Sequence, residues 1–265
     1  MTRFLLPLLF AGFTQAAEPS FFLEMPWRYV LGAQQDGKWF TSEQTGKNFN
    51  QARSYDLFTL EGKAGSVKAN RAEADVDVCP DVWLVPITPE PDPDKSFIGV
   101  NATWNAQPRI AKKGALTVEA YVKATSDLLA KNGLAKSKAK LTQHLRVDLD
   151  LDGEEDVLIA AEQYQLREDD AFVPTSTKAG DYSVVYLRRV VNGKVKTQML
   201  VGDFYRTAAD FNVPWSHEVS GLLDLDGDGQ LEIIIHSAYY EGATTTVWKL
   251  QGGEYVKVLE LACGV

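Results

Sequence analysis

Two acidic segments, 148–156 and 224–232, have the residue types and the spacing of a calcium-binding loop. Both follow the pattern D-x-D-x-D-G-x-x-(D/E). Calcium takes six to eight oxygen ligands. Carboxylates at positions 1, 3, 5 and 9 can surround one ion together with the backbone carbonyl of position 7, and the glycine at position 6 permits the sharp turn. We expect two Ca²⁺ sites, formed by Asp148, Asp150, Asp152, Glu154 and Asp156 in the first loop, and by Asp224, Asp226, Asp228, Gln230 and Glu232 in the second.

The chemistry of these loops favours calcium over other metals. Carboxylates that lie this close together repel one another and raise each other's pKa values, so a divalent cation would relieve a real cost. Magnesium prefers fewer protein ligands in strict octahedral geometry, and zinc would need cysteine or histidine at ligand spacing. The alternative interpretation is an acidic, solvated turn that holds no ion.

The residues after each loop exclude a helix–loop–helix calcium motif. An EF-hand loop has glutamate at position 12, where this chain has Ile159 and Ile235. The segments that follow position 9 are apolar and β-branched, which is typical of strands. Each ion would therefore lie between a loop and a strand.

The loops belong to an internal repeat. Residues 147–164 and 223–240 align without a gap at an offset of 76 positions. Each unit continues into a second strand, a tight turn and a third strand. We place the two units at about 145–200 and 221–262, with second strands at 182–190 and 244–250, turns at Asn192-Gly193 and Gly252-Gly253, and an insertion at 165–180 in the first unit.

These two segments resemble the FG-GAP or VCBS-type repeats of integrin-like β-propellers. The resemblance rests on the loops at 148–156 and 224–232 with their following strands, and it covers about 145–265. It implies antiparallel β-units similar to propeller blades. It also implies calcium ligands at loop positions 1, 3, 5 and 9 and at the position-7 carbonyl, on the ten residues named above.

The rest of the chain predicts a mainly β (α+β) fold. Residues 17–110 are β-rich and irregular, and residues 115–265 hold one clear helix followed by the two repeats. The helix is expected at about 117–131, with Thr117 as its N-cap, because apolar residues recur there at three- and four-residue spacing. Asn132-Gly133 is suited to end it.

The N-terminus predicts export. Residues 1–16 combine a positive charge at Arg3, a short apolar stretch and small residues near Ala16, as in a cleaved signal peptide. Cys79 and Cys263 are the two cysteines of the chain, and in an exported protein they are expected to form a disulfide. We therefore expect a periplasmic or extracellular protein.

The net charge and the aromatic residues indicate which classes of binding partner to expect. A net charge of −9 argues against nucleic acid, and no later segment is long and apolar enough for membrane insertion. We expect a monomer. Four aromatic residues near the repeats form a candidate surface for a protein or carbohydrate ligand, although core packing is the alternative: Tyr164, Trp215, Tyr239 and Tyr240.

Two functions remain open from the sequence. The favoured one is a non-enzymatic, exported module in which calcium rigidifies loops and so fixes a surface for adhesion or ligand capture. The alternative is a secreted or periplasmic hydrolase with structural calcium. A deep cleft with converging histidine and carboxylate side chains would favour the enzyme, whereas filled loops on a flat face would favour the binding module.

Overall fold

The computed structural model describes residues 18–75, 79–93, 95–164 and 174–264. Antiparallel sheets dominate it, with one long and one short helix, so the predicted mainly β fold is confirmed. Residues 1–16, the expected signal peptide, lie outside the described residues. Among the described residues, no helix is both long and apolar enough to cross a membrane.

The N-terminal part forms a nine-stranded sheet in the order β6-β7-β2-β1-β9-β4-β5-β8, with β3 paired to β2. A short helix, α1 (Ser42–Gly46), begins after a capping box at Thr41. The strands are β1 (Ser20–Met25), β2 (Tyr29–Gln35), β3 (Lys38–Phe40), β4 (Arg53–Thr59), β5 (Gly62–Ala69), β6 (Glu73–Ala74), β7 (Trp83–Leu84), β8 (Ile87–Thr88) and β9 (Phe97–Asn101).

The two repeats are two antiparallel meanders of four strands each. The short strand β10 (Lys112–Lys113) adds a fifth strand to the first sheet. Unit one consists of β11 (Leu141–Val147), β12 (Asp156–Gln163), β13 (Tyr182–Val191) and β14 (Lys194–Phe204), and unit two of β15 (Ser216–Leu223), β16 (Glu232–Tyr239), β17 (Gly242–Gln251) and β18 (Glu254–Gly264). Each unit thus begins one strand before its acidic loop.

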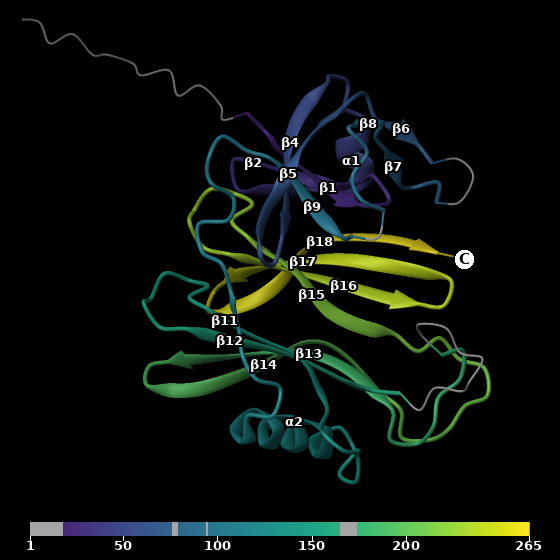
Figure 1. The fold of residues 1–265 in the computed structure, drawn as a ribbon, viewed down its shortest axis with the longest axis vertical. Coiled ribbons are helices and arrows are strands. Elements are labelled where there is room, and N and C mark those ends of the chain that lie inside the picture. Colours follow the sequence, from purple (N-terminus) through teal and green to yellow (C-terminus); the bar gives the residue numbers. More distant parts are fainter. Residues whose placement is uncertain (1–17, 76–78, 94, 165–173, 265) are drawn as a thin grey trace, which may run out of the picture.

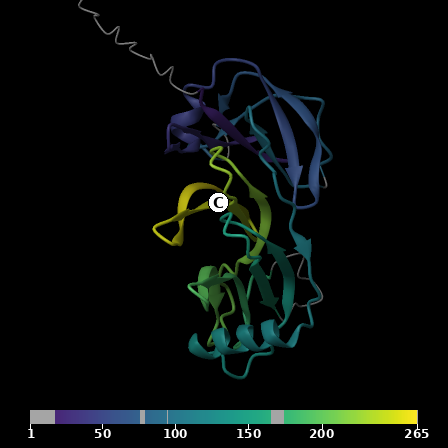
Figure 2. The same cartoon turned by 90° about the vertical axis from the view of Figure 1, so that its left-hand side faces the viewer.

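The layers do not follow the order of the sequence (Figures 1 and 2). The N-terminal sheet packs on unit two, unit two packs on unit one, and the long helix covers the outer face of unit one. Three buried clusters connect the layers. Phe22 and Ile234 belong to the first cluster, Leu158 and Ile233 to the second, and Leu129 with β12 and β13 residues to the third.

The long helix α2 (Glu119–Lys131) begins two residues later than predicted. Val118 is the N-cap and provides no side-chain cap, so the prediction of Thr117 as N-cap is wrong. The backbone is extended at Val118, so this residue occupies the N-cap position. Only a side chain at the N-cap can accept a hydrogen bond from the free amides of the first turn. Thr117 lies one residue before that position. At the other end Gly133 has a φ of 88° and ends the helix in the left-handed conformation, as expected.

Two other predicted features are confirmed. Tight hairpin turns join β13 to β14 at Asn192-Gly193 and β17 to β18 at Gly252-Gly253, with positive φ at all four residues. Cys79 and Cys263 form a disulfide with a Cα–Cα distance of 5.6 Å. The bond joins the N-terminal part to the last strand of unit two.

Candidate functional site: two acidic loops and a pocket

Each acidic loop connects the first and second strands of its unit. The first lies between β11 and β12, and the second between β15 and β16. The loops end where Asp156 and Glu232 pair with the last residues of the preceding strands, Val147 and Leu223. Position 9 of each loop is therefore fixed by the sheet, which aims its carboxyl group back into the loop.

The same hydrogen bonds shape both loops. In the first, both carboxylate oxygens of Asp148 accept backbone N–H groups, from Leu151 at 2.8 Å and Gly153 at 3.2 Å. In the second, Asp224 accepts from Gly227 at 2.7 Å and Gly229 at 3.0 Å. The hydrogen-bonding residues of the two loops are separated by the repeat offset of 76 positions, so the two loops share one backbone hydrogen-bond pattern.

Position 9 repeats this equivalence. Asp156 accepts the backbone N–H of Leu149 at 3.1 Å, and Glu232 accepts that of Leu225 at 2.7 Å. Each of these carboxyl groups thereby ties the end of its loop to the second residue of the same loop.

The carboxylates converge in both loops. One oxygen each of Asp148, Asp150 and Asp152 lie within 4.8 Å of one another, and so do oxygens of Asp224, Asp226 and Glu232. Position 5 joins the group in loop one and position 9 joins it in loop two. Each loop thus brings three of its four predicted carboxylates together, and Asp156 and Asp228 lie outside these groups.

Burial makes these carboxyl groups costly to ionise. Burial, opposed mainly by the Leu149 amide, raises the pKa of Asp156 to about 7. Burial likewise raises the pKa of Glu232 to about 8, against the lowering effect of Lys249. The pKa of Asp224 is raised by burial too, and the nearby Asp226 adds to the shift. A cation among these groups would favour their charged forms.

Each loop has such a cation from its own sheet. Lys249 Nζ lies 2.8 Å from carboxylate oxygens of Asp226 and Asp228 and 3.1 Å from Glu232. In loop one, Arg189 Nη1 lies 3.1 Å from Asp150. No local sequence pattern indicates either residue, because each lies on a strand that is distant from its loop along the chain.

The position-3 carboxylates keep capacity for a further ligand. Asp150 Oδ1 and Asp226 Oδ1 are buried and have no hydrogen-bond partner among the described residues, and the same holds for Gln230 Oε1. Buried oxygens without a donor are costly, and they are the hard ligand type that calcium prefers. The donor set therefore fits calcium at positions 1, 3, 5 and 9, provided that the basic side chains give way.

The two loops lie back to back, joined by Arg109. Its Nε donates to the carbonyl oxygen of Asp148 and its Nη2 to that of Gly229, both at 2.7 Å. The backbone N–H of Leu231 also donates to the carbonyl of Leu149 at 2.8 Å. No sequence pattern links Arg109 to the loops, so only the fold reveals this clamp.

The segment after the N-terminal sheet supports loop two. Trp104 Nε1 donates to the carbonyl of Asp224 at 2.9 Å, and the backbone N–H of Asp224 donates to Ala106 at 2.8 Å. The indole covers Gly227, where a Cβ atom would lie 3.1 Å from the ring. Loop two is consequently more enclosed than loop one.

The four predicted surface aromatics come together, at the other end of the sheet from the loops. The Tyr164 hydroxyl donates to the carbonyl of Trp215. The Trp215 ring lies 4.6 Å from that of Tyr239, which lies 5.7 Å from that of Tyr240. Because Tyr239 ends the strand that Glu232 begins, about 23 Å of extended chain separates the aromatics from loop two.

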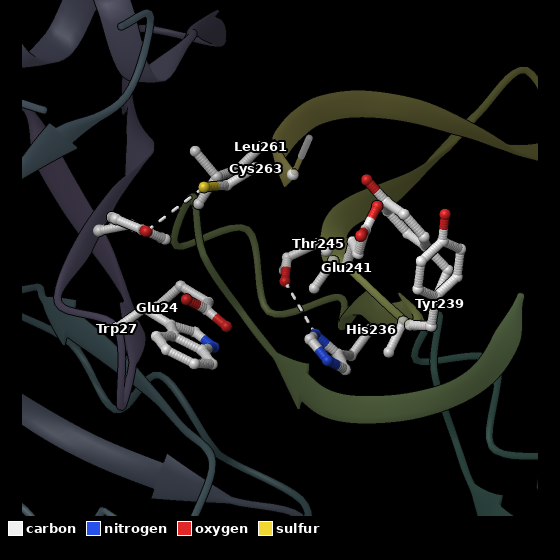
Figure 3. A pocket seen from close by; sticks show the side chains of 14 residues that line it. Glu24, Trp27, His236, Tyr239, Glu241, Thr245, Leu261 and Cys263 are labelled. Carbon is white, nitrogen blue, oxygen red and sulfur yellow. Dashed lines mark hydrogen bonds between the residues drawn. The ribbon is translucent and has the colours of Figure 1, made fainter. Parts of the chain in front are cut away.

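Beside these aromatics lies a pocket of about 520 Å³ that the sequence analysis did not anticipate (Figure 3). One wall comes from the N-terminal sheet, with Glu24, Trp27 and Tyr29, and the other from β16 to β18 of unit two. The Tyr29 hydroxyl lies 3.4 Å from the sulfur of Cys263, so the disulfide lies at the junction of the two walls. Glu24 gave no sequence signal because it lies within a short apolar strand.

Three polar side chains, Glu24, His236 and Thr245, form the floor of this pocket. All three line both the pocket and a small adjoining cavity of about 10 Å³. Burial raises the pKa of Glu24 to about 7 and lowers the pKa of His236. His236 Nδ1 lies 3.3 Å from the Thr245 hydroxyl. At neutral pH the histidine is thus neutral, and Glu24 is the ionisable acid of the floor.

Comparison of the chain with protein-family models, with curated proteins and with solved structures finds no match.

Proposed function

We propose that this protein is an exported calcium-binding protein, with one ion held by each of two repeats of the FG-GAP or VCBS type. In this proposal calcium stabilises the loops of a binding module. The observation that carries it is the equivalence of the two loops, which share one hydrogen-bond design and aim carboxylates at a common point. Binding of one cation by each copy would explain why the same acidic turn occurs in both repeats.

Calcium would supply charge and cross-linking rather than chemistry. Asp148, Asp150, Asp152 and Asp156 would hold one ion and their equivalents in unit two the other. Because the loops are joined through Arg109 and through the Leu231–Leu149 hydrogen bond, fixing one loop also restrains the other. A metal that binds only the folded state stabilises it by about 2.7 kcal/mol at a hundredfold excess over Kd.

The Lys249 contacts favour a second possibility, in which the loops are neutralised internally. Its ammonium group already lies within hydrogen-bonding distance of three carboxylates. In that case the acidic loops are structural ion-pair networks and take up no metal. Calcium titration separates the two possibilities.

The hydrolase alternative has one feature in its favour. His217 Nδ1 lies 2.8 Å from the Ser237 hydroxyl and its Nε2 lies 2.9 Å from Asp203. This set has the composition of a catalytic triad, but the ring nitrogens are exchanged relative to the usual arrangement. Ser237 is only 6% exposed and lies within the β15–β16–β17 sheet, so a structural role fits it better.

Calorimetric titration of chelator-treated protein with calcium tests the proposal. We expect two bound ions per chain, with Asp150→Asn and Asp226→Asn each removing one. Asp127→Asn, on the exposed face of α2, is the matched control and should retain both. A wild-type protein that takes up no calcium would overturn the metal sites in favour of internal neutralisation.

Export is a separate part of the proposal, and the disulfide supports it, because such bonds persist in oxidising compartments. Mass spectrometry of the protein recovered from its native host tests it. We expect a chain that begins after Ala16 and retains the Cys79–Cys263 bond. An intact N-terminus with two free thiols would contradict export.

A further inference from the structure

We propose that the pocket between the N-terminal sheet and unit two binds a small organic cation, a protonated amine carried on an apolar body. The proposal rests on the binding part of the proposed function and names the chemical class of its ligand. It draws on three properties of the pocket: its charge, an unpartnered buried acid and its aromatic walls.

The charge of the pocket is negative. Its lining includes two acids, Glu24 and Glu241, and none of the described residues that line it is lysine or arginine. His236 adds no positive charge near neutral pH, because burial lowers its pKa. A ligand with a positive group is therefore favoured over a neutral or anionic one of the same shape.

Glu24 supplies the specific contact. The residue is only 6% exposed, and its Oε2 atom has no hydrogen-bond partner among the described residues. Figure 3 shows its carboxyl group in the same space that His236 faces from the opposite side. A buried, unpaired carboxylate is costly, and an ammonium group from a ligand would provide both the missing charge and the missing donors.

The walls fit the remainder of such a ligand. Trp27, Tyr29, Tyr239 and Tyr240 line the pocket, and Trp27 is 57% exposed at its rim. Aromatic faces attract cations and also pack well against an apolar body. The volume of about 520 Å³ is that of a small-molecule site.

The same lining argues against a sugar as the occupant. A carbohydrate needs several hydrogen-bonding groups around its ring, whereas much of this lining is aromatic or small. Thr245 already contacts His236, and Tyr29 contacts the Cys263 sulfur. The buried acid Glu24, set against aromatic walls, suits one ammonium group better than a ring of hydroxyls.

Three probes of nearly equal size test the proposal by calorimetry at about pH 8, where Glu24 is ionised. They are 2-phenylethylamine, the neutral 2-phenylethanol and the anion phenylacetate, with glucose as a carbohydrate probe. We expect the amine to bind at least about tenfold more tightly than the alcohol, a difference of about 1.4 kcal/mol. Phenylacetate and glucose should bind more weakly than the alcohol.

Variants locate the binding. Glu24→Gln should lower the amine affinity to that of the alcohol, whereas Glu43→Gln, at an exposed position of helix α1, should leave it unchanged. Trp27→Ala should weaken the binding of both probes, and it decides the location if Glu24→Gln does not fold. The proposal would be overturned if the wild type bound the amine and the alcohol with equal affinity, or if Glu24→Gln bound the amine as tightly as the wild type does. Preferential binding of glucose would assign the pocket to carbohydrate.

Calcium titration of the same variants keeps the two proposals apart. None of the loop-two residues lines either cavity that Glu24 lines, so Glu24→Gln should still bind two calcium ions. Loss of calcium binding with intact amine binding would overturn the metal sites alone. Loss of amine selectivity with intact calcium binding would overturn the pocket assignment alone.

Discussion

Arg189 and Lys249 occupy the same position in the two repeats. Val157 pairs with Arg188, and Ile233 pairs with Trp248, so each basic residue lies one step beyond an equivalent pair. The sequence alignment does not show this relationship, because the insertion in unit one changes the spacing. Each acidic loop thus has a partner cation on the adjoining strand.

The first prediction concerns Lys249→Met. Without calcium, removing the ammonium leaves buried carboxylates uncompensated, and we expect the free energy of unfolding to fall by about 3 kcal/mol. With calcium, the competitor is gone, so the affinity of loop two should rise. Denaturation with chelator and with calcium, together with calorimetry, checks both effects.

Arg189→Met should have the same two effects on loop one. Lys257→Met, at an exposed lysine of β18, is the control and should change neither the stability nor the calcium affinity. If Lys249→Met binds calcium no better than the wild type, competition between the lysine and calcium is refuted.

Arg109→Met should loosen both loops at once. The guanidinium donates to carbonyl oxygens of both loops, and losing two such charged hydrogen bonds should cost about 3 kcal/mol. Hydrogen exchange should show faster exchange at Leu149 and Leu231 together. Arg109→Lys should recover only part of the loss, because an ammonium cannot reproduce the forked geometry. An effect confined to one loop would contradict the clamp.

Gly227→Ala should destabilise unit two more than its backbone conformation alone explains. The φ of Gly227 is 79°, and a Cβ there would lie 3.1 Å from Trp104. Gly252→Ala is the matched control, because Gly252 has a φ of 60° with nothing within 4 Å. We expect about 1–2 kcal/mol for the control, from the left-handed backbone, and a larger loss at Gly227. If chemical denaturation shows equal losses in the free energy of unfolding for the two variants, the Trp104 indole moves aside without cost.

The stability of the protein should depend on pH through Glu24. Burial raises its pKa from 4.5 to about 7, so between these values the folded state keeps a proton that the unfolded state has released. Stability from this group is therefore full below about pH 4.5 and falls as the pH rises to about 7, by about 3 kcal/mol at most. The other titratable groups that line the pocket are Tyr29, His236, Tyr239, Tyr240 and Glu241.

Glu24→Gln should remove the part of the pH dependence that Glu24 contributes, leave the part that the buried Asp156 and Glu232 contribute, and make the protein more stable at pH 8 than the wild type. Denaturation of both proteins over this pH range is the measurement. An unchanged pH profile in the variant would assign the dependence to another group.

Replacing Cys79 and Cys263 by serine should lower the melting temperature markedly. The bridge closes a loop with a sequence separation of 184 residues, for which chain entropy gives on the order of 5 kcal/mol. Reductant should shift the wild type in the same direction and leave the double variant unaffected. The variant should also bind the amine probe more weakly, because Cys263 lines the pocket beside Tyr29.

The loops were predictable from sequence because their chemistry is local. Asp148 and Asp224 are bonded by residues three and five positions ahead, so a pattern of nine residues contains the whole turn. The tight turns at Asn192-Gly193 and Gly252-Gly253 were predictable for the same reason: two residues determine the backbone conformation.

The rest of the site depends on contacts between residues far apart in the chain. Arg109 lies 39 and 120 positions from the residues it joins. Glu24 and His236 line one pocket from two different sheets. Nothing in the local sequence around either residue distinguishes it from an ordinary surface arginine or strand glutamate, because tertiary packing alone creates their surroundings.

The order of the layers has a consequence for how the protein is made. The N-terminal sheet emerges from the ribosome first, yet the face that carries Phe22 is buried by unit two, whose β18 is made last. Until unit two is made, that apolar face lacks its native neighbours on β15 to β18, although unit one and its helix are by then complete. A chain released before β18 would expose this face to solvent, and it would be a natural target for chaperones and for aggregation.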